Sequence, residues 1–427
     1  IRDRYNMSES PKIAIIGAGP SGLTALKNLV MNGFDVTCFE MNDQIGGNWV
    51  YKDKTGHSSV FKTTHIISSK KFSEYTDFPM PDDYPDYPSG AELLAYFNSY
   101  VDTFNLKQYI RFNTKVKKAI PLDNKWKIFY DDLSMDFDYL IIANGHHWSP
   151  RIPKFEGNFS GELMHSHQFK NNEYFKNKSV LVVGGGNSAC DIAVEISRVA
   201  KKTSISMRRG YHFIPKFMMG MPSDEYYAKT LWIPQRIRLY LQKLALRIVQ
   251  GKYENYGLQK PDHDILQSHA TVNSELLYFI KHGKISPRKN IRCFSNKNVE
   301  FIDGKKEDFD VVLFATGYEI SFPFFSTSNI DYENNDIDLY NFCFHPKYTN
   351  LMFVGLLQPL GCIWPLSDLQ SQLIVKYLKN EWNYPKDFEQ AVFEQQNNMP
   401  YNFIDTPRHK LEVDFHSFRK HLENEIN

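Results

Sequence analysis

The feature that most constrains this chain is a short apolar run followed by a glycine-rich turn and a helical pattern, which occurs twice. The two copies are KIAIIGAGPSGL at residues 12–23 and SVLVVGGGNSACD at residues 179–191. Such a unit opens a Rossmann-like domain and binds the pyrophosphate of a dinucleotide at its helix N-terminus. Two copies in one chain predict an α/β fold with two doubly wound dinucleotide-binding domains.

The first copy favours a dinucleotide with a free ribose diol. The strand that should follow its helix ends at Glu40, about 20 residues after the last glycine of the turn. A carboxylate at this position accepts hydrogen bonds from the ribose hydroxyls and repels a 2′-phosphate. We therefore expect FAD in this cradle. The expected FAD contacts are Gly17, Gly19, Pro20, Ser21, Gly22 and Glu40.

The second copy favours a dinucleotide with a 2′-phosphate. Its following strand ends at Arg208 and Arg209, at the place where the first copy has Glu40. Guanidinium groups bind phosphate through charge-assisted, bidentate hydrogen bonds, which predicts NADPH. The alternative is a solvated basic end of a strand. The expected NADP contacts are Gly184, Gly186, Asn187, Ser188, Arg208 and Arg209.

Composition argues against several other classes of protein. Fifty basic and forty-nine acidic residues give a net charge of +1, so no overall field attracts nucleic acid or an anionic membrane. No apolar run reaches the roughly 20 residues of a membrane-spanning helix, and the start lacks a signal-peptide pattern, so we expect a cytoplasmic chain with no membrane partner. The five cysteines lie far apart in the sequence, which argues against a redox dithiol and against a bound metal.

Several further motifs lie between and beyond the two cradles. FSGELMHSHQF, at residues 159–169, fits the pattern FxGxxxHxxx(F/Y). The other motifs are GGNW at 46–49, DFPMP at 77–81, ANGH at 143–146, FATGY at 314–318 and GLLQPLG at 355–361. On these motifs the chain resembles the flavin-containing monooxygenases, which are class B flavoprotein monooxygenases, and within them the soluble bacterial type. The resemblance spans nearly the whole chain.

The resemblance implies an enzyme that uses NADPH and O₂ to oxygenate nucleophilic nitrogen or sulfur, as in amines and sulfides, through a C4a-hydroperoxyflavin. It also implies a homodimer. Related Baeyer–Villiger enzymes end the central signature in Trp, so Phe169-Lys170 favours heteroatom oxygenation. A Baeyer–Villiger enzyme and an uncoupled NADPH oxidase are the alternatives. The motifs add Gly47, Asn48, Trp49 and Gln358 to the expected FAD contacts.

One position departs from the family pattern. Family members carry Asn in an N-x-[S/C]-K stretch near the C4a edge of the flavin, and alignment on DFPMP places Ile67, Ser68, Ser69 and Lys70 there. An apolar side chain cannot supply the hydrogen bonds of an amide. We expect Ile67, Ser68 and Ser69 at the catalytic edge. Either serine replaces the amide, bound NADP⁺ does so, or the oxygen adduct is short-lived.

The order of the motifs predicts that the NADPH domain is inserted into the FAD domain. The stretch 231–249 shows apolar residues at helical spacing, and it is a lid over the substrate channel, a surface helix or a dimer contact. We expect His165 to orient the linker between the domains. The expected parts are residues 7–163 and 291–427 for the FAD domain and residues 164–290 for the NADPH domain, with a helical insertion near 211–280.

Overall fold

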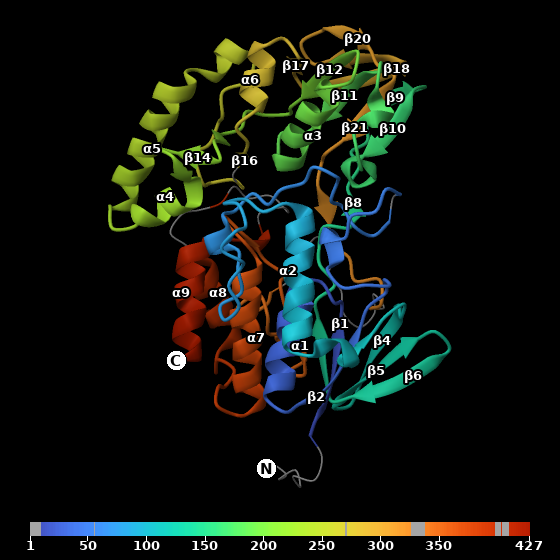
Figure 1. Ribbon diagram of the computed structural model, residues 1–427, viewed down its shortest axis with the longest axis vertical. Coiled ribbons are helices and arrows are strands. Elements are labelled where there is room, and N and C mark those ends of the chain that lie inside the picture. Colours follow the sequence, from blue (N-terminus) through green and yellow to red (C-terminus); the bar gives the residue numbers. More distant parts are fainter. Residues whose placement is uncertain (1–9, 55, 270, 326–337, 398–402, 404–409) are drawn as a thin grey trace.

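The computed structural model describes residues 10–54, 56–269, 271–325, 338–397, 403 and 410–427. These residues form two α/β bodies, one above the other in Figure 1. The lower body contains the first glycine turn and the C-terminal helices. The upper body contains the second glycine turn and a helical extension on its left side.

The first sheet has five parallel strands in the order β23-β7-β1-β2-β3. These strands are β1 (Lys12–Ile16), β2 (Asp35–Phe39), β3 (Ile110–Arg111), β7 (Tyr139–Ile142) and β23 (Leu351–Phe353). After Lys12, β1 is apolar and buried, as is typical of a parallel strand covered by helices on both faces. Helix α1 (Pro20–Met31) packs against α7 (Trp364–Leu378), which packs against α9 (Phe415–Ile426). The C-terminal part of the chain therefore completes the first body.

The second sheet repeats this arrangement with the order β10-β21-β11-β12-β17, again all parallel. Its strands are β10 (Glu162–His165), β11 (Ser179–Val183), β12 (Lys202–Ser206), β17 (Ile285–Arg288) and β21 (Val311–Phe314). In both sheets the strand that precedes the glycine turn is the central one. Helix α3 (Asn187–Ser197) packs on β11 and β12, and α6 (Leu276–Lys281) packs on α3 and on the edge strand β17. The predicted fold of two doubly wound units is confirmed.

In each body, three antiparallel strands form a meander that directly precedes one strand of the parallel sheet. This strand is β7 in the first sheet and β21 in the second. The first meander is β4 (Val116–Leu122), β5 (Lys125–Tyr130) and β6 (Leu133–Phe137); the second is β18 (Ile291–Asn296), β19 (Asn298–Phe301) and β20 (Lys306–Asp308), with β9 (Glu156–Phe159) beside β18. The second sheet thus takes strands from residues 162–314 and differs from the expected segment 164–290. The difference arises because β21 pairs with β11 only after the chain has passed through the meander.

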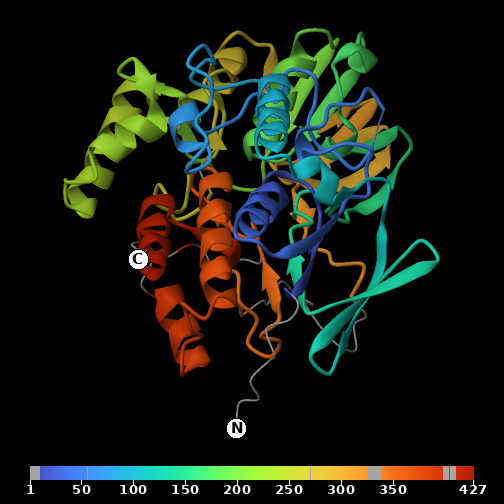
Figure 2. The same ribbon diagram turned by 60° about the horizontal axis from the view of Figure 1, so that its bottom comes forward.

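The insertion between β12 and β17 projects from the upper body. It contains β13 (Phe213–Ile214), β14 (Phe217–Met218), β15 (Met221–Pro222), α4 (Ser223–Lys229), α5 (Gln235–Gln250) and β16 (Thr271–Val272). The helix expected over 231–249 begins later, after Pro234, and ends at Gly251 with φ +75°. Figures 1 and 2 both place α5 at the edge of the molecule, away from both sheets.

Two short strands join the bodies. β8 (Ser149–Pro150) leaves the first sheet and pairs antiparallel with β22 (Tyr318–Glu319), which leaves the second. The remaining elements are α2 (Gly90–Thr103), α8 (Phe388–Asn397), β24 (Gln358–Pro359) and β25 (Glu412–Val413). Because β8 follows β7 of the first sheet and β22 follows β21 of the second, their pairing fixes the carboxyl ends of the two sheets toward each other.

Candidate functional site

A cavity of about 1000 Å³ lies between the two sheets, and both glycine turns form part of its wall. This volume is at the upper end of the range for small-molecule sites. The turns follow β1 and β11, so the cavity lies at the carboxyl ends of parallel strands, where doubly wound folds bind their ligands.

The first cradle requires glycine for geometric reasons. The N–H of Gly17 donates to the carbonyl of Phe39 over 2.8 Å, and a Cβ on Gly17, whose φ is +106°, would lie 2.6 Å from the carbonyl oxygen of Ala143. A Cβ on Gly22 would lie 1.9 Å from the oxygen of Gly17, so α1 packs directly on the turn. The N-cap residue of helix α1 is Gly19, so the helix has no side-chain cap. Its first N–H groups are therefore available to a phosphate.

The second cradle has the same local structure. The N–H of Gly184 donates to the carbonyl of Ser206 over 2.9 Å, and a Cβ at this position, with φ +140°, would lie 2.4 Å from the oxygen of Ala315. Helix α3 begins at Gly186, also without a side-chain cap. In contrast, α2 carries a complete capping box from Ser89. The two cradle helices thus keep uncapped N-termini at the cavity, where a pyrophosphate fits.

Glu40 is held in one orientation at the first cradle. One carboxylate oxygen accepts the N–H of Ala18 over 2.8 Å, and the other accepts the N–H and the side-chain amide of Asn42 over 2.8 and 2.7 Å. The residue is buried and lines the cavity. Since each carboxylate oxygen can accept more than one hydrogen bond, the group can still accept from a ribose diol.

Arg208 and Arg209 differ in their surroundings at the second cradle. Both line the cavity, and Arg208 is exposed with no carboxylate within ion-pair distance in the described part of the chain. Arg209 lies over the ring of Tyr211, donates to Ser268 over 3.3 Å, and has a buried Nε without a partner among the described residues. Arg208 is therefore the more accessible group for a 2′-phosphate.

The charges around the cavity fit two phosphate-rich dinucleotides. Among the described lining residues the carboxylates are Glu40 and Asp191, whereas the permanent cations are Lys115, Arg151, Arg208 and Arg209. Burial raises the pKa of Asp191 to about 6, and the side-chain amide of Asn273 donates to this carboxyl group over 2.6 Å. The residues present thus fit FAD in the first cradle and NADPH in the second.

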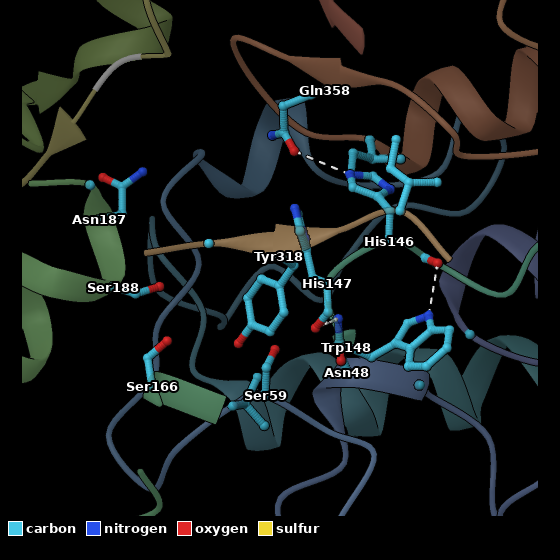
Figure 3. Close-up of a pocket in the computed structure, with 18 of the residues that line it drawn as sticks. Asn48, Ser59, His146, His147, Trp148, Ser166, Asn187, Ser188, Tyr318 and Gln358 are labelled. Atoms are coloured by element: carbon cyan, nitrogen blue, oxygen red, sulfur yellow. Dashed lines mark hydrogen bonds between the residues drawn. The ribbon is translucent and has the colours of Figure 1, made fainter. Parts of the chain in front are cut away.

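The predicted cofactor contacts come together around this cavity. All of the predicted FAD and NADP residues line it except Gly22, which packs behind the turn. Gln358 and His146 are joined by a hydrogen bond of 3.3 Å, and Asn48 donates to the carbonyl of His147 over 3.3 Å, as Figure 3 shows in part. The buried Oδ1 of Asn48 has no hydrogen-bond partner in the described structure.

The three residues predicted at the catalytic edge have different positions. Ile67 and Ser68 line the cavity, but Ser69 is fully buried, and its N–H donates to Asp224 of α4 over 2.6 Å. The hydroxyl of Ser73 donates to the carbonyl of Ser69 over 2.7 Å and lies 2.9 Å from the hydroxyl of Ser68. The Ser68 proton is thus donated to Ser73, so Ser68 can accept a hydrogen bond from the cavity but has no proton left to donate.

Sequence reasoning missed an aromatic wall between the two cradles. The rings of His57 and Trp148 lie 5.5 Å apart, and those of His147 and Tyr318 lie 5.8 Å apart, each pair tilted. In Figure 3 the hydroxyl of Tyr318 points toward Ser59 and Ser166. Burial lowers the pKa of His57 to about 4 and raises that of Tyr318, so both side chains are neutral at pH 7. The available signal was the triplet HHW directly after the ANG turn.

His165 has the position expected of a linker-orienting residue. Its Nδ1 accepts the N–H of His167 over 3.1 Å, which places the proton on Nε2, and this atom donates to the carbonyl of Gly317 over 3.0 Å. Burial lowers the pKa of His165 to about 4. The neutral ring thus ties the end of β10 to the segment that enters β22.

Comparison with known proteins identifies the same family that the sequence motifs resemble. The family described as "Flavin-binding monooxygenase-like" matches residues 10–427. Rat flavin-containing monooxygenase 5 is 34% identical over 95% of this chain and 80% of its own, and macaque dimethylaniline monooxygenase [N-oxide-forming] 2 is 34% identical over 88% and 75%. The structure of OTEMO in complex with FAD and NADP superposes with a TM-score of 0.75 at 17% identity, over 98% of this chain and 99% of that one.

Two further findings bear on the sequence predictions. All five cysteines are free thiols, and four of them are buried. Across the described residues, none of the helices combines the length and the apolar character that crossing a bilayer requires.

Proposed function

Because the chain belongs to the flavin-binding monooxygenase-like family, we propose that it is an NADPH- and O₂-dependent monooxygenase that oxygenates nucleophilic nitrogen or sulfur. The observation that carries this proposal is one cavity with two cradles of opposite preference. Glu40 lies at the first cradle and Arg208 at the equivalent place in the second. FAD and NADPH are the cofactors that this pair of residues suits.

The chemistry supplied by bound FAD and NADPH is hydride transfer followed by activation of O₂. The chain's own part is to orient the two dinucleotides and to place neutral aromatic side chains between the two cradles. His57 and Tyr318 lie in this space and are neutral at pH 7, because burial disfavours their charged forms. The His146–Gln358 hydrogen bond fixes a second polar group at the first cradle.

An uncoupled NADPH oxidase is the second candidate, and one observation favours it. At the predicted catalytic edge Ile67 is apolar, and the Ser68 hydroxyl already donates its proton to Ser73. The described loop thus offers no side-chain donor from these two residues. If a donor is needed there to retain activated oxygen, part of the NADPH oxidised yields hydrogen peroxide.

The test is a product balance on the purified protein with NADPH, using N,N-dimethylaniline, a dialkyl sulfide and a cyclic ketone in separate reactions. We expect N-oxide and sulfoxide, with product and hydrogen peroxide together equal to the NADPH consumed. Ester from the ketone with no N-oxide would establish Baeyer–Villiger activity instead. Peroxide with no oxygenated product would establish the oxidase.

We further propose the homodimeric state, the cytoplasmic location and the division into an FAD domain interrupted by an NADPH domain that the sequence suggests. Support for the interrupted domain is the return of the chain to the first sheet at β23. Light scattering on the eluting protein tests the dimer, and limited proteolysis near the β8–β22 pair tests the division.

A further inference from the structure

A carboxylate–histidine pair lies at the cavity, outside both dinucleotide cradles. The Nδ1 atom of His269 lies 3.2 Å from the carboxylate of Glu412. His269 stands two residues before Thr271, whose hydroxyl donates to the carbonyl of Gly185 in the second glycine turn over 3.0 Å. Glu412 begins β25 and is in register with Gln358 of β24, at the first cradle. The pair therefore joins the two bodies between their cradles.

The two members of the pair have an ordered position relative to the cavity. His269 lines the cavity, whereas its described wall does not include Glu412, whose side chain is 0% exposed. The carboxylate therefore lies behind the imidazole ring. Because Nδ1 faces the carboxylate, Nδ1 carries the proton and donates it to Glu412, and Nε2 keeps its lone pair. Nε2 forms no hydrogen bond with a described residue, so it is free to accept a proton.

The carboxylate of Glu412 lacks full compensation of its charge. Burying a carboxylate is costly unless hydrogen bonds or a cation compensate it. Its Oε1 atom has no hydrogen-bond partner among the described residues, and no described Lys or Arg forms an ion pair with it. His269 is the partner that the described structure provides, and it carries a compensating charge only when its ring is protonated. The surroundings of Glu412 thus favour the uptake of one proton at Nε2 of His269.

We propose that His269 is a general base that removes the proton from alkylammonium substrates, and that Glu412 is the positioning residue that orients it. This inference rests on the proposed function and names its substrate class, the aliphatic amines. An alkyl amine, like the lysine side chain, is an ammonium ion at neutral pH and has no free electron pair on nitrogen. Oxygen transfer requires that pair. A carboxylate behind an imidazole fixes the tautomer and stabilises the imidazolium that forms.

The proton balance of the reaction includes this step. The N–H bond of the ammonium breaks, its electron pair stays on nitrogen, and the proton moves to Nε2 of His269. One oxygen atom of O₂ then bonds to nitrogen, and the other becomes water with the hydride hydrogen of NADPH and the proton that His269 releases. The sum is R₃NH⁺ + NADPH + O₂ → R₃NO + NADP⁺ + H₂O, which returns His269 to its neutral form. A sulfide or an aryl amine enters without this proton and needs no base.

The test compares two amines of similar size, N,N-dimethylbenzylamine and N,N-dimethylaniline. The first is an ammonium ion at neutral pH, whereas the second is uncharged because its lone pair is delocalised into the ring. The ratio of their kcat/KM values for N-oxide formation should fall at least about tenfold in His269→Gln, since a positioned general base contributes at least this much. Glu412→Gln should lower the ratio by less. The double variant should lower it no further than His269→Gln, because Glu412 acts through His269.

A spectroscopic measurement and a control accompany the kinetics. In ¹⁵N NMR of histidine-labelled protein, the signal that His269→Gln removes should show a proton on Nδ1, and Glu412→Gln should shift this signal toward the Nε2–H tautomer. Asp414→Asn is the matched control, because Asp414 is a buried carboxylate two residues from Glu412 that accepts the N–H of Ser417 over 2.8 Å. It should leave the ratio unchanged. Retained FAD and an unchanged circular dichroism spectrum show that each variant is folded.

The outcomes separate this inference from the proposed function. If both amines are oxygenated and His269→Gln leaves their ratio unchanged, the inference is wrong and the proposed function stands. A wild-type protein that oxygenates dimethylaniline but not dimethylbenzylamine also overturns the inference alone. An equal fall of the ratio in Asp414→Asn does the same, since the loss would then follow from removing any buried carboxylate. A wild-type protein that oxygenates neither amine and no dialkyl sulfide contradicts the proposed function itself.

Discussion

At the scale of single residues, two equivalent positions separate the two ligands. Glu40 and Arg208 each follow the second strand of a glycine unit, and the hydrogen bonds of the two turns are the same within 0.1 Å, at 2.8 and 2.9 Å. The backbone of the two glycine turns therefore does not distinguish one dinucleotide from the other. The choice between a ribose diol and a 2′-phosphate falls to these side chains.

Replacing Arg208 should change the preference between the two nicotinamide nucleotides. Its guanidinium is exposed and forms no ion pair with a described carboxylate, so Arg208→Ala removes a ligand contact without opening the fold. We expect the KM for NADPH to rise about 10- to 100-fold and that for NADH to change little. Steady-state kinetics with both nucleotides measure this. An equal rise for both nucleotides would assign Arg208 a structural role.

At the predicted catalytic edge, an added amide should reduce the release of hydrogen peroxide. Ile67→Asn supplies a donor at a position that lines the cavity, and one good hydrogen bond is worth about 1–3 kcal/mol. We expect hydrogen peroxide per NADPH to fall by about tenfold. Ser68→Ala should change the ratio much less, because its proton is donated to Ser73 in the native protein. If Ile67→Asn leaves the ratio of hydrogen peroxide to NADPH unchanged, this loop does not control the release of hydrogen peroxide.

Asp191 predicts a pH-dependent stability. Burial raises its pKa from 3.8 to about 6, so folding disfavours the charged form, and the resulting cost is absent below pH 4 and complete above about pH 6. Asp191→Asn should therefore raise the melting temperature of the cofactor-free protein at pH 7, by an amount that corresponds to roughly 3 kcal/mol. The gain should vanish near pH 4. A gain that is equal at both pH values would point to packing rather than ionisation.

At the scale of elements, α4 joins the insertion between β12 and β17 to the loop that carries Ile67, Ser68 and Ser69. Asp224 accepts the N–H of Ser69 over 2.6 Å, and Tyr87 donates to the carbonyl of Lys216 nearby. The rings of Tyr87 and Phe217 are also 5.3 Å apart. The position of the loop beside the first cradle therefore depends on an element of the second body.

Removing this connection should loosen the catalytic edge. Asp224→Ala deletes a charge-assisted hydrogen bond to the loop backbone, and we expect hydrogen peroxide per NADPH to rise several-fold. Asp224→Asn, which keeps an acceptor oxygen, should be milder. Glu225→Gln is the matched control, because its carboxylate lies 4.0 Å from Lys71 at the surface. A rise of the same size in the control would show that the release of hydrogen peroxide does not depend on the hydrogen bond between Asp224 and Ser69.

The elements differ in how far the sequence predicts them. The two cradles were predictable because the turn, the strand before it and the helix after it are fixed by neighbouring residues such as Gly17 and Gly184. The contact of Asp224 with Ser69 joins residues from two bodies, and no local pattern encodes it. The aromatic wall of His57 and Trp148 likewise forms only when distant loops meet. The sequence also predicted a helix near residues 231–249, but not its place at the edge of the molecule.

At the scale of the whole molecule, four strands of each sheet correspond, β7-β1-β2-β3 in the first and β21-β11-β12-β17 in the second, and the cavity lies at the carboxyl ends of both sheets. The β8–β22 pair joins the two bodies, and the hydrogen bond from His165 to Gly317 ties the end of β10 to the residue before β22. A donor dinucleotide in the upper body and a flavin in the lower body can thus share one cavity. This geometry is what an enzyme that passes electrons from NADPH through FAD to O₂ needs.

The most direct test of this function is the origin of the oxygen in the product. The purified protein is supplied with NADPH, N,N-dimethylaniline and ¹⁸O₂ in ordinary water, and the N-oxide is analysed by mass spectrometry. A monooxygenase predicts one ¹⁸O atom in every N-oxide molecule, with formation of product dependent on NADPH and unaffected by catalase. Product that carries ¹⁶O from water, or NADPH oxidation whose oxygen is recovered entirely as hydrogen peroxide, would contradict it.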